Sequence, residues 1–328
     1  MQPFTYVRAS NVGDAVKALS RGAKLLAGGT TLYDLMKLRI ERPERIIDIN
    51  HLGELKHFDT SGERELVFGA LARMSEVAAD AGLVRDYPAI SESLWRAASQ
   101  QLRNMASLGG NLLQRTRCPY FRGGEPYACN KRDPGSGCAA AEGLDRGQAL
   151  LGASPSCSAV YPGDFAAALV AFDAEIDVVG PGGERVLPFE ELHREPADTP
   201  QKETTLEPGE MIVRIRIPVT PLGRASTFLK VRDRESYAFA LASAAVALEM
   251  DGDVVRDARV AVGGLATRPW RARAAERLLI GCRFDESAAR AAGEAALDGA
   301  IPGRSNAFRI ELGIRTVTDA LMTARQRA

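Results

Sequence analysis

The sequence predicts an α+β protein with more than one domain. Over the first hundred or so residues, segments with helical periodicity alternate with short apolar runs typical of strands. Beyond about residue 222, strand-like segments follow one another as in an antiparallel meander, and three Ala/Arg-rich helical segments end the chain. The chain has 328 residues, more than the roughly 100 to 200 of a usual single domain.

The N-terminal elements are predicted in the order helix, strand, turn and helix. A helix over 11–21 follows the capping candidates Ser10 and Asn11, and "AKLLAGG" predicts a short buried strand that ends in glycines. Helical periodicity resumes in "TLYDLMKLR". The next segments are predicted as strands at 44–50 and 65–71 and as helices at 75–84 and 89–103.

The second half contains mainly strands until its last third. A helix over 164–174 precedes a strand pair, 175–188, that turns on Pro-Gly-Gly, and a strand over 210–218 follows a polar surface loop. That loop is predicted over 194–210, and a domain boundary near residue 222. The strands of the meander are predicted at 227–233, 240–250 and 254–266.

Charge and apolar patterning exclude two classes of partner. Forty-two basic and 42 acidic side chains cancel, so the field that attracts a phosphate backbone is missing and we expect no nucleic-acid partner. The start of the chain contains no apolar core of signal-peptide length, and nowhere do about 18 apolar residues follow one another. We therefore expect a soluble chain with no membrane segment and no export signal of its own.

A glycine-containing turn between a strand and a helix, "LLAGGTTLYDLM", is the first candidate site. Backbone N–H groups at Gly28, Gly29, Thr30 and Thr31 converge near the positive end of a helix dipole, which suits a phosphate or pyrophosphate. Glycine matters there because no Cβ keeps the phosphate from the backbone. A tight Gly-Gly turn with Thr31 as a plain helix cap explains the same residues without any ligand.

Two further glycine patterns carry less information. "SLGGNLLQ", with Asn111, also permits a close backbone approach, but it is weak alone. "GSGCAA" at 135–140 fits the dinucleotide pattern G-x-G-x-x-A, but it follows Asp133-Pro134 instead of an apolar strand. We therefore reject it, and no Walker A sequence is present.

Four of the five cysteines, Cys118, Cys129, Cys138 and Cys157, lie within forty residues of Pro/Gly-rich sequence. The intervals between them match neither zinc knuckles nor the bacterial ferredoxin run. Coordination by four thiolates is the economical interpretation, and the basic residues nearby would offset its negative charge. An iron–sulfur cluster, a structural zinc ion and unrelated free thiols remain open alternatives.

Residues for hydrolytic or acid–base catalysis form no recognisable pattern. The three histidines, His51, His57 and His193, show no metal-binding spacing, and we expect each to be a loop or surface residue. No nucleophile elbow surrounds the serines at 154–158. The sequence therefore predicts cofactor sites without a catalytic acid, base or nucleophile.

Four collinear segments resemble the FAD-binding subunit of the xanthine dehydrogenase and aldehyde oxidoreductase family of molybdenum hydroxylases. They are "LLAGGTTLYDLMKL", "SLGGNLLQRTRCPYF", "YPGDFAAALVAFDAEI" and "FLKVRDRESYAFALASAAVAL". The cysteine-bearing insert is similar to that of the flavin subunit of bacterial periplasmic three-subunit aldehyde oxidoreductases. The resemblance implies that Cys118, Cys129, Cys138 and Cys157 hold a [4Fe-4S] cluster.

The resemblance also implies which residues contact FAD. Two turns would grip the pyrophosphate together: Leu26, Ala27, Gly28, Gly29, Thr30, Thr31 and Leu32 in the first, and Ser107, Gly110 and Asn111 in the second. Asp164 corresponds to a flavin-contacting aspartate, although it is also placed to cap the next helix. Lys230 and Val213 match positions near the adenine half, and Tyr237 an aromatic position beside the isoalloxazine ring.

The fold implied by the resemblance is a two-part FAD domain of the vanillyl-alcohol-oxidase type followed by a C-terminal sheet with helices. We expect subdomains at about 1–55 and 56–222, with the insert at 115–157, and a C-terminal domain at 223–328. The insert would be a surface excursion that orders around its cluster, because polar Gly/Pro-rich sequence buries too little apolar area to order itself.

The implied function is electron transfer within a heterotrimer. A molybdenum-cofactor-binding large subunit would oxidise the substrate, a [2Fe-2S] small subunit would relay electrons, and FAD on this chain would pass them to an acceptor such as a ferredoxin. Two rivals remain: a stand-alone FAD-dependent reductase with zinc in the insert, and a scaffold subunit with a degenerate FAD site. The expected location is cytoplasmic, or periplasmic by export with a signal-bearing partner.

Overall fold

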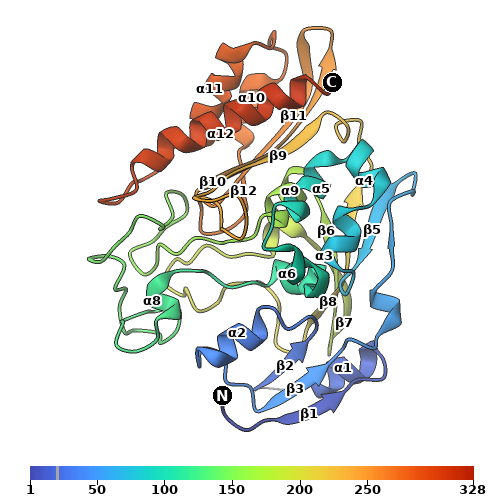
Figure 1. The fold of residues 1–328 in the computed structure, drawn as a ribbon, viewed down its shortest axis with the longest axis vertical. Coiled ribbons are helices and arrows are strands. Elements are labelled where there is room, and N and C mark those ends of the chain that lie inside the picture. The colour runs from blue at the N-terminus through green and yellow to red at the C-terminus, as the bar shows by residue number, and fades with distance from the viewer. Residues whose placement is uncertain (20–21) are drawn as a thin grey trace.

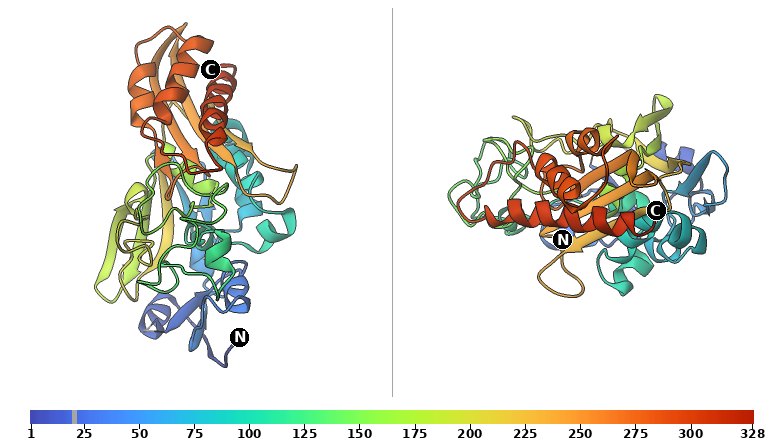
Figure 2. Two further views of the ribbon diagram at one scale, coloured as in Figure 1. Left: turned by 90° about the vertical axis from the view of Figure 1, so that its left-hand side faces the viewer. Right: turned by 90° about the horizontal axis from the view of Figure 1, so that it is seen from above.

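A computed structural model describes residues 1–19 and 22–328 of the chain. The molecule is elongated, and three parts follow one another along its long axis (Figure 1). The N-terminal part lies at one end, a larger middle part follows, and the C-terminal strands and helices form the other end. A view turned by 90° shows the same succession (Figure 2). Within the described residues, the strands form one sheet in each part.

The N-terminal part is a small parallel sheet with the order β1-β3-β2. Its strands are β1 (Thr5–Arg8), β2 (Ala23–Leu26) and β3 (Arg45–Asp48), and its helices are α1 (Val12–Ala18), α2 (Leu32–Lys37) and the short η1 (Gly53–Leu55). The side chain of Asn11 caps α1 by accepting a hydrogen bond from the Asp14 N–H. The last two residues of the helix predicted over 11–21 lie outside the described residues.

The middle part combines an antiparallel sheet with short helices. The strand order is β4-β5-β8-β6-β7. The strands are β4 (Phe58–Asp59), β5 (Glu65–Gly69), β6 (Glu175–Gly180), β7 (Gly183–Pro188) and β8 (Met211–Pro218). The helices are α3 (Met74–Ala78), α4 (Ala81–Asp86), α5 (Pro88–Trp95), α6 (Gln100–Met105), α7 (Leu108–Leu112), α9 (Phe165–Ala171) and the short η2 (Phe189–Glu191). Every residue of α9 is buried in the core of this part.

Two helices predicted as continuous are each divided in the structure. The predicted helix 75–84 is interrupted at Asp80, whose side chain accepts a hydrogen bond from the Leu83 N–H and so begins α4. The predicted helix 89–103 is interrupted at Ala98, which has a φ of 48°, and Ser99 caps α6. Those predictions were wrong because polar residues able to cap a helix were counted as ordinary interior positions.

The C-terminal part confirms the predicted antiparallel meander and the three helices. Its sheet has the order β12-β11-β10-β9. The elements are β9 (Ser226–Val231), β10 (Ala242–Asp251), β11 (Val254–Gly263), β12 (Trp270–Arg271), α10 (Arg273–Leu279), α11 (Glu286–Ala296) and α12 (Phe308–Arg325). Helix α12 packs on β10 and β9. Residues 242–248 of β10 are all buried, which accounts for their run of small apolar side chains.

Residues 115–157, called here the cysteine segment, connect α7 to α9 and lie to one side of the middle part (Figure 1). This fully described segment contains one short helix, α8 (Pro119–Arg122), and otherwise turns and isolated bridges. Outside residues 20 and 21, the chain has no helix whose length and apolar character would let it cross a bilayer.

Candidate functional site

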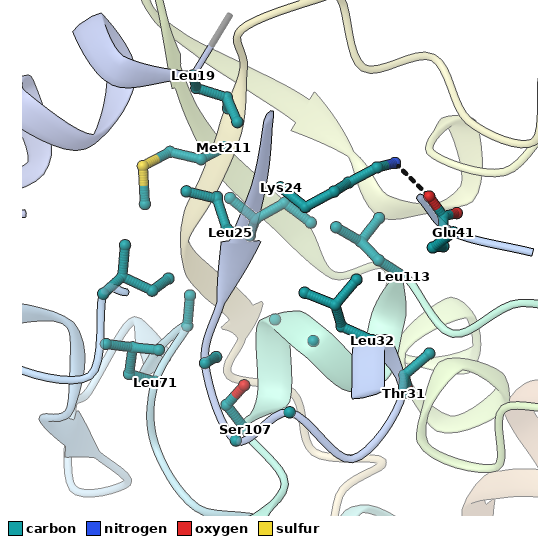
Figure 3. A pocket seen from close by; sticks show the side chains of 18 of the residues that line it. Leu19, Lys24, Leu25, Thr31, Leu32, Glu41, Leu71, Ser107, Leu113 and Met211 are labelled. Atoms are coloured by element: carbon teal, nitrogen blue, oxygen red, sulfur yellow. Dashed lines mark ion pairs between the residues drawn. The ribbon is translucent and has the colours of Figure 1, made fainter. Parts of the chain in front are cut away.

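A cavity of about 870 Å³ lies between the N-terminal and middle parts, and both predicted glycine turns line it. Residues 27–32 form one wall, where β2 passes into α2. Ser107, Gly109 and Gly110 form another at the start of α7. Apolar side chains such as Leu25, Leu71 and Met211 surround the remaining space (Figure 3). Segments nearly eighty residues apart therefore meet at one concave, largely apolar site, as cofactor sites usually require.

The first turn has a backbone path that only glycines permit. A Cβ on Gly28 would lie 1.8 Å from the carbonyl oxygen of Met105, so the turn and the end of α6 are in close contact. Gly29 has a φ of +73°, a conformation that side-chain-bearing residues rarely adopt. Thr31 occupies the N-cap position of α2 without a side-chain capping bond, so the ligand-free explanation of this residue is not supported.

The second turn begins a helix where a loop was expected. Ser107 is the N-cap residue of α7, and a Cβ on Gly109 would lie 2.9 Å from the Cβ of Ala70. Asn111 does not line the cavity, but its buried Oδ1 atom has no hydrogen-bond partner among the described residues. A buried polar oxygen without a partner is unfavourable, and a bound group that donates a hydrogen bond would satisfy it. The two glycine turns thus border one cavity where the backbone can be approached closely, whereas Asn111 Oδ1 requires a hydrogen-bond donor and is not satisfied by a pyrophosphate oxygen.

Asp164 and Lys230 lie outside the cavity and bind each other. Their Oδ2 and Nζ atoms are 2.6 Å apart, both side chains are buried, and Lys230 also donates to the Arg96 carbonyl at 3.2 Å. Burial raises the pKa of Asp164, and the Lys230 ammonium opposes that rise. Asp164 stands at the N-cap position of α9 but makes no capping bond, so its carboxylate instead joins the middle part to β9.

The remaining residues implied by the resemblance have other surroundings. The Leu26 carbonyl accepts hydrogen bonds from the Ile49 N–H and the Asn50 side chain just before the first turn. Val213 packs partly buried against the N-terminal core, and its carbonyl accepts from the Ala70 N–H. Tyr237, 57% exposed, lies between β9 and β10 with a φ of 53°. None of the three is among the residues that line the large cavity.

All four cysteines of the cysteine segment line a single small cavity. Cys129 and Cys138 pair in an isolated antiparallel bridge, Cys157 bridges Ser154, and Cys118 precedes α8. The thiols form no disulfides. Burial raises the pKa of the Cys118 thiol, and it raises that of Cys157 to about 11 although Lys131 opposes the shift. Four thiols from 40 residues of irregular chain are thus brought to one place.

The cysteine cavity does not have the geometry of a single-ion site. Zinc with four thiolates places sulfurs about 3.8 Å apart, from Zn–S bonds of about 2.3 Å in a tetrahedron. In the part of the chain that the structure describes, no group of three or more Cys, His, Asp or Glu residues could hold one metal ion. The four cysteines share one cavity, but the described residues do not arrange them around a metal ion.

The basic residues near the cysteines are largely committed to other partners. Arg115 pairs with Glu41 and Glu203, and Arg117 and Arg122 both pair with Asp34. Lys131 is the basic residue that lines the cysteine cavity itself. The sequence interpretation, in which these cations offset thiolate charge, missed the carboxylates that bind them. Those carboxylates are distant in sequence, so no local pattern signals them.

A third cavity of about 320 Å³ lies between the other two and includes His193. His193 was expected to be a loop or surface residue. It lies outside the helices and strands, in an isolated bridge with Thr204, but it is buried, and its Nε2 atom is 2.9 Å from the Leu112 carbonyl oxygen. Burial lowers its pKa to about 4. The sequence did not indicate this burial, because the Tyr161 and Phe189 rings beside His193 are brought there only by the fold.

Comparisons with known proteins match both halves of the chain. Residues 2–220 match the family described as the FAD binding domain in molybdopterin dehydrogenase, and residues 227–324 match the CO dehydrogenase flavoprotein C-terminal domain. The aldehyde oxidoreductase FAD-binding subunit PaoB of Escherichia coli (strain K12) is 43% identical, and the match covers 100% of both chains.

More distant relatives belong to carbon monoxide dehydrogenases. The medium chain from Afipia carboxidovorans is 28% identical over 99% of this chain and 98% of its own. The solved structure of reconstituted CO dehydrogenase from Oligotropha carboxidovorans superposes with a TM-score of 0.76 at 26% identity, over 100% of this chain and 99% of that chain. With both turns in place around one cavity, the chain belongs to the FAD-binding subunits of the molybdopterin dehydrogenase family.

Proposed function

We propose that this chain is the FAD-carrying, electron-transferring subunit of a molybdenum-dependent aldehyde oxidoreductase. The large cavity, whose two walls are the two glycine turns, is the observation that carries the proposal. When bound there, FAD supplies the ability to accept electrons singly and to release them singly or in pairs. The chain holds and orients the cofactor, and substrate oxidation belongs to a partner subunit.

The charged residues of the cavity support binding more than acid–base chemistry. Glu41 contacts Lys24 at 3.2 Å, the pair drawn in Figure 3, and Arg115 at 2.8 Å. Glu210 lines the cavity and accepts two hydrogen bonds from Arg185, which lies outside it. Each of these titratable groups is therefore already neutralised by an opposite charge, and none is placed as a free general acid or base.

The four cysteines are proposed to hold a [4Fe-4S] cluster. Their convergence on one cavity supports joint coordination by four thiolates, and the resemblance of the cysteine-bearing insert favours a cluster over zinc. The stand-alone reductase with structural zinc has no supporting observation.

The assembly and its location follow as further proposals. A molybdenum-cofactor-binding large subunit and a [2Fe-2S] small subunit would complete a heterotrimer, with a ferredoxin or a similar carrier as the acceptor. The medium chains of two carbon monoxide dehydrogenases, similar over 98% and 86% of their own length, support a subunit of a larger complex. We propose the vanillyl-alcohol-oxidase type for the FAD domain. The complex would be cytoplasmic, or periplasmic if a partner carries the export signal.

Cofactor counting tests the proposal directly. The purified chain is to be examined by anaerobic visible spectroscopy, with iron, zinc and acid-labile sulfide counted per flavin. About four irons and four sulfides per FAD are expected for one [4Fe-4S] cluster held by the four cysteines. Flavin with one zinc and no iron would retain the FAD site and exclude the cluster.

A single methyl group tests whether the large cavity is the FAD site. Gly28→Ala places a Cβ against the Met105 carbonyl, so the first turn must move and FAD occupancy should be lost. Gly53→Ala is the matched control, since nothing lies within 4 Å of its added Cβ. Equal flavin content in both purified variants would exclude the first turn as part of the FAD site.

Electron transfer without substrate oxidation is tested with the chain on its own. Loaded with FAD, it should not oxidise aldehydes at a measurable fraction of the rate of the full complex. Aldehyde oxidation by the isolated chain at the rate of the complex would contradict the division of labour.

A further inference from the structure

The cysteine segment is bound to the helix that carries the first glycine turn. Helix α2 begins immediately after residues 27–31, and its Asp34 accepts hydrogen bonds from two arginines of the segment. Arg117 Nη1 lies 3.1 Å and Arg122 Nη2 2.8 Å from the Asp34 carboxylate. The side chains of these residues are about one quarter to one third exposed, so solvent screens the contacts only in part.

An apolar contact accompanies these ion pairs. Leu35, the residue after Asp34, forms a small buried cluster with Phe121 and Cys129. Leu35 also lines the large cavity, and Cys129 also lines the cysteine cavity. One small apolar cluster therefore borders both the space assigned to FAD, through Leu35, and the four-thiol cavity, through Phe121 and Cys129.

A second connection consists of alternating charges. Glu41 binds Lys24 and Arg115, Arg115 reaches Glu203 at 2.6 Å, and Lys131 lies 3.6 Å from Glu203. This series of ion pairs starts at residues that line the large cavity and ends at Lys131, which lines the cysteine cavity. Burial by itself would lower the pKa of Arg115, but Glu203 and Glu41 together raise that pKa by more. The net pKa lies above its usual value, so the guanidinium stays charged.

We propose that the cysteine segment positions the FAD site, with Asp34 as the positioning residue. The segment contains one four-residue helix and otherwise turns, so it depends on its anchors for order. A group bound by the four cysteines orders Arg117, Arg122 and Phe121, and these hold α2 and the first turn in the conformation that binds FAD. Occupancy of each site therefore strengthens the other. This inference rests on the proposed cofactors.

The decisive measurement is the FAD dissociation constant before and after the iron is removed by a chelator. It uses the full chain and follows flavin fluorescence. Removal of iron should weaken FAD binding at least about fivefold, the lower end of typical coupling between sites. By reciprocity, bound FAD should raise the affinity for iron, so that a higher chelator concentration is needed to remove half of the iron at equilibrium. Asp34→Asn should reduce the ratio of the two dissociation constants toward one while iron content remains that of the unaltered chain.

Matched variants separate this coupling from general damage. Arg122→Gln removes one of the two arginine partners of Asp34, the one with the shorter contact, and neither Asp34 nor Arg122 lines the large cavity. It should weaken FAD binding as Asp34→Asn does, the double variant should add little, and Arg122→Lys should restore most of the effect. Glu311→Gln is the control, because Glu311 also pairs with two arginines but lies on α12.

Each outcome assigns the failure to one proposal. If the unaltered chain contains no iron, the proposed cluster is wrong. If iron is present and its removal leaves the FAD dissociation constant within twofold, the coupling is wrong and the cofactor assignment stands. If Asp34→Asn does not fold, the FAD dissociation constants of Arg122→Gln and of the unaltered chain, each measured with and without iron, still test the coupling. An equal effect of Glu311→Gln would exclude Asp34 as a specific positioning residue.

Discussion

The C-terminal part and the cysteine segment are ordered by different forces. The former buries a continuous apolar core between β10, β11 and the helices α11 and α12, with fully buried residues such as Val260 and Leu321. In the latter, Phe121 is fully buried and Leu150 and Leu151 join the C-terminal core, but most of the segment is held by ion pairs, backbone contacts and converging thiols. Apolar burial is non-directional and is shared among many neighbours, whereas a hydrogen bond or ion pair depends on one partner in one geometry.

The two regions also meet. Buried Arg309 of α12 donates hydrogen bonds to the carbonyls of Gln148 and Leu241, and Asp145 accepts from the backbone N–H groups of Arg304 and Ser305. The rigid C-terminal part therefore fixes the far end of the segment. The comparison teaches how an irregular segment stays ordered. Contacts from neighbouring helices and strands, or from a bound group, provide the stabilisation that its own apolar residues do not.

The largest expected effect is at the buried pair that joins the middle part to β9. Asp164→Asn leaves the Lys230 ammonium buried without a counter-charge and should lower the free energy of unfolding by about 3 to 5 kcal/mol. Urea unfolding followed by circular dichroism measures this. Asp164→Asn combined with Lys230→Met should cost less than Asp164→Asn alone. A double variant that is less stable than the single one would contradict this account.

A pair of core truncations tests the comparison itself. Leu321→Ala should lower the free energy of global unfolding by about 2 to 5 kcal/mol, because it leaves a cavity in the C-terminal core. Phe121→Ala should instead open the cysteine segment locally, since its cluster includes few other residues. Hydrogen exchange should show faster exchange confined to 115–157, with the urea midpoint nearly unchanged. A comparable fall in the urea midpoint for both variants would mean that the segment belongs to the global core.

The next effect is a dependence on pH. The native His193 ring is buried and neutral, with its pKa lowered to about 4 from 6.5, so below pH 6.5 the unfolded chain binds a proton that the native chain does not. The unfolding free energy should therefore fall as pH drops from about 6.5 to 4, by up to about 3 kcal/mol. His193→Gln should remove this contribution. Parallel urea titrations at pH 7 and pH 5 that show the same loss in both proteins would refute the assignment.

The smallest expected effect concerns exposed ion pairs of the C-terminal part. Glu311→Gln removes contacts to Arg290 and Arg315, whose side chains are 47% and 71% exposed. Solvent screens such pairs, so the free energy of unfolding should not change measurably. Thermal unfolding of this variant should match the unaltered chain. A loss near that of Leu321→Ala would show that ion pairs also hold the regular part together.

Local sequence patterns predicted the helices and strands well where the apolar residues alternate or recur with helical periodicity. The antiparallel meander and the three C-terminal helices are confirmed, because alternation and helical periodicity report burial directly. The helices predicted over 75–84 and 89–103 were wrong at Asp80 and Ser99, where side chains cap new helices. The edge strand β1, exposed along its length, gave no apolar signal and was missed.

The sequence by itself determined the two glycine turns, the four clustered cysteines and the family that these residues indicate. Glycine and cysteine carry such information locally, since one permits a backbone path and the other supplies a ligand atom. Only the tertiary structure decided that the two turns share a cavity, that Asp164 binds Lys230, and that Asp34 holds the arginines of the cysteine segment. These are contacts between residues 66 to 88 positions apart, and pairing at such distances depends on how the chain packs.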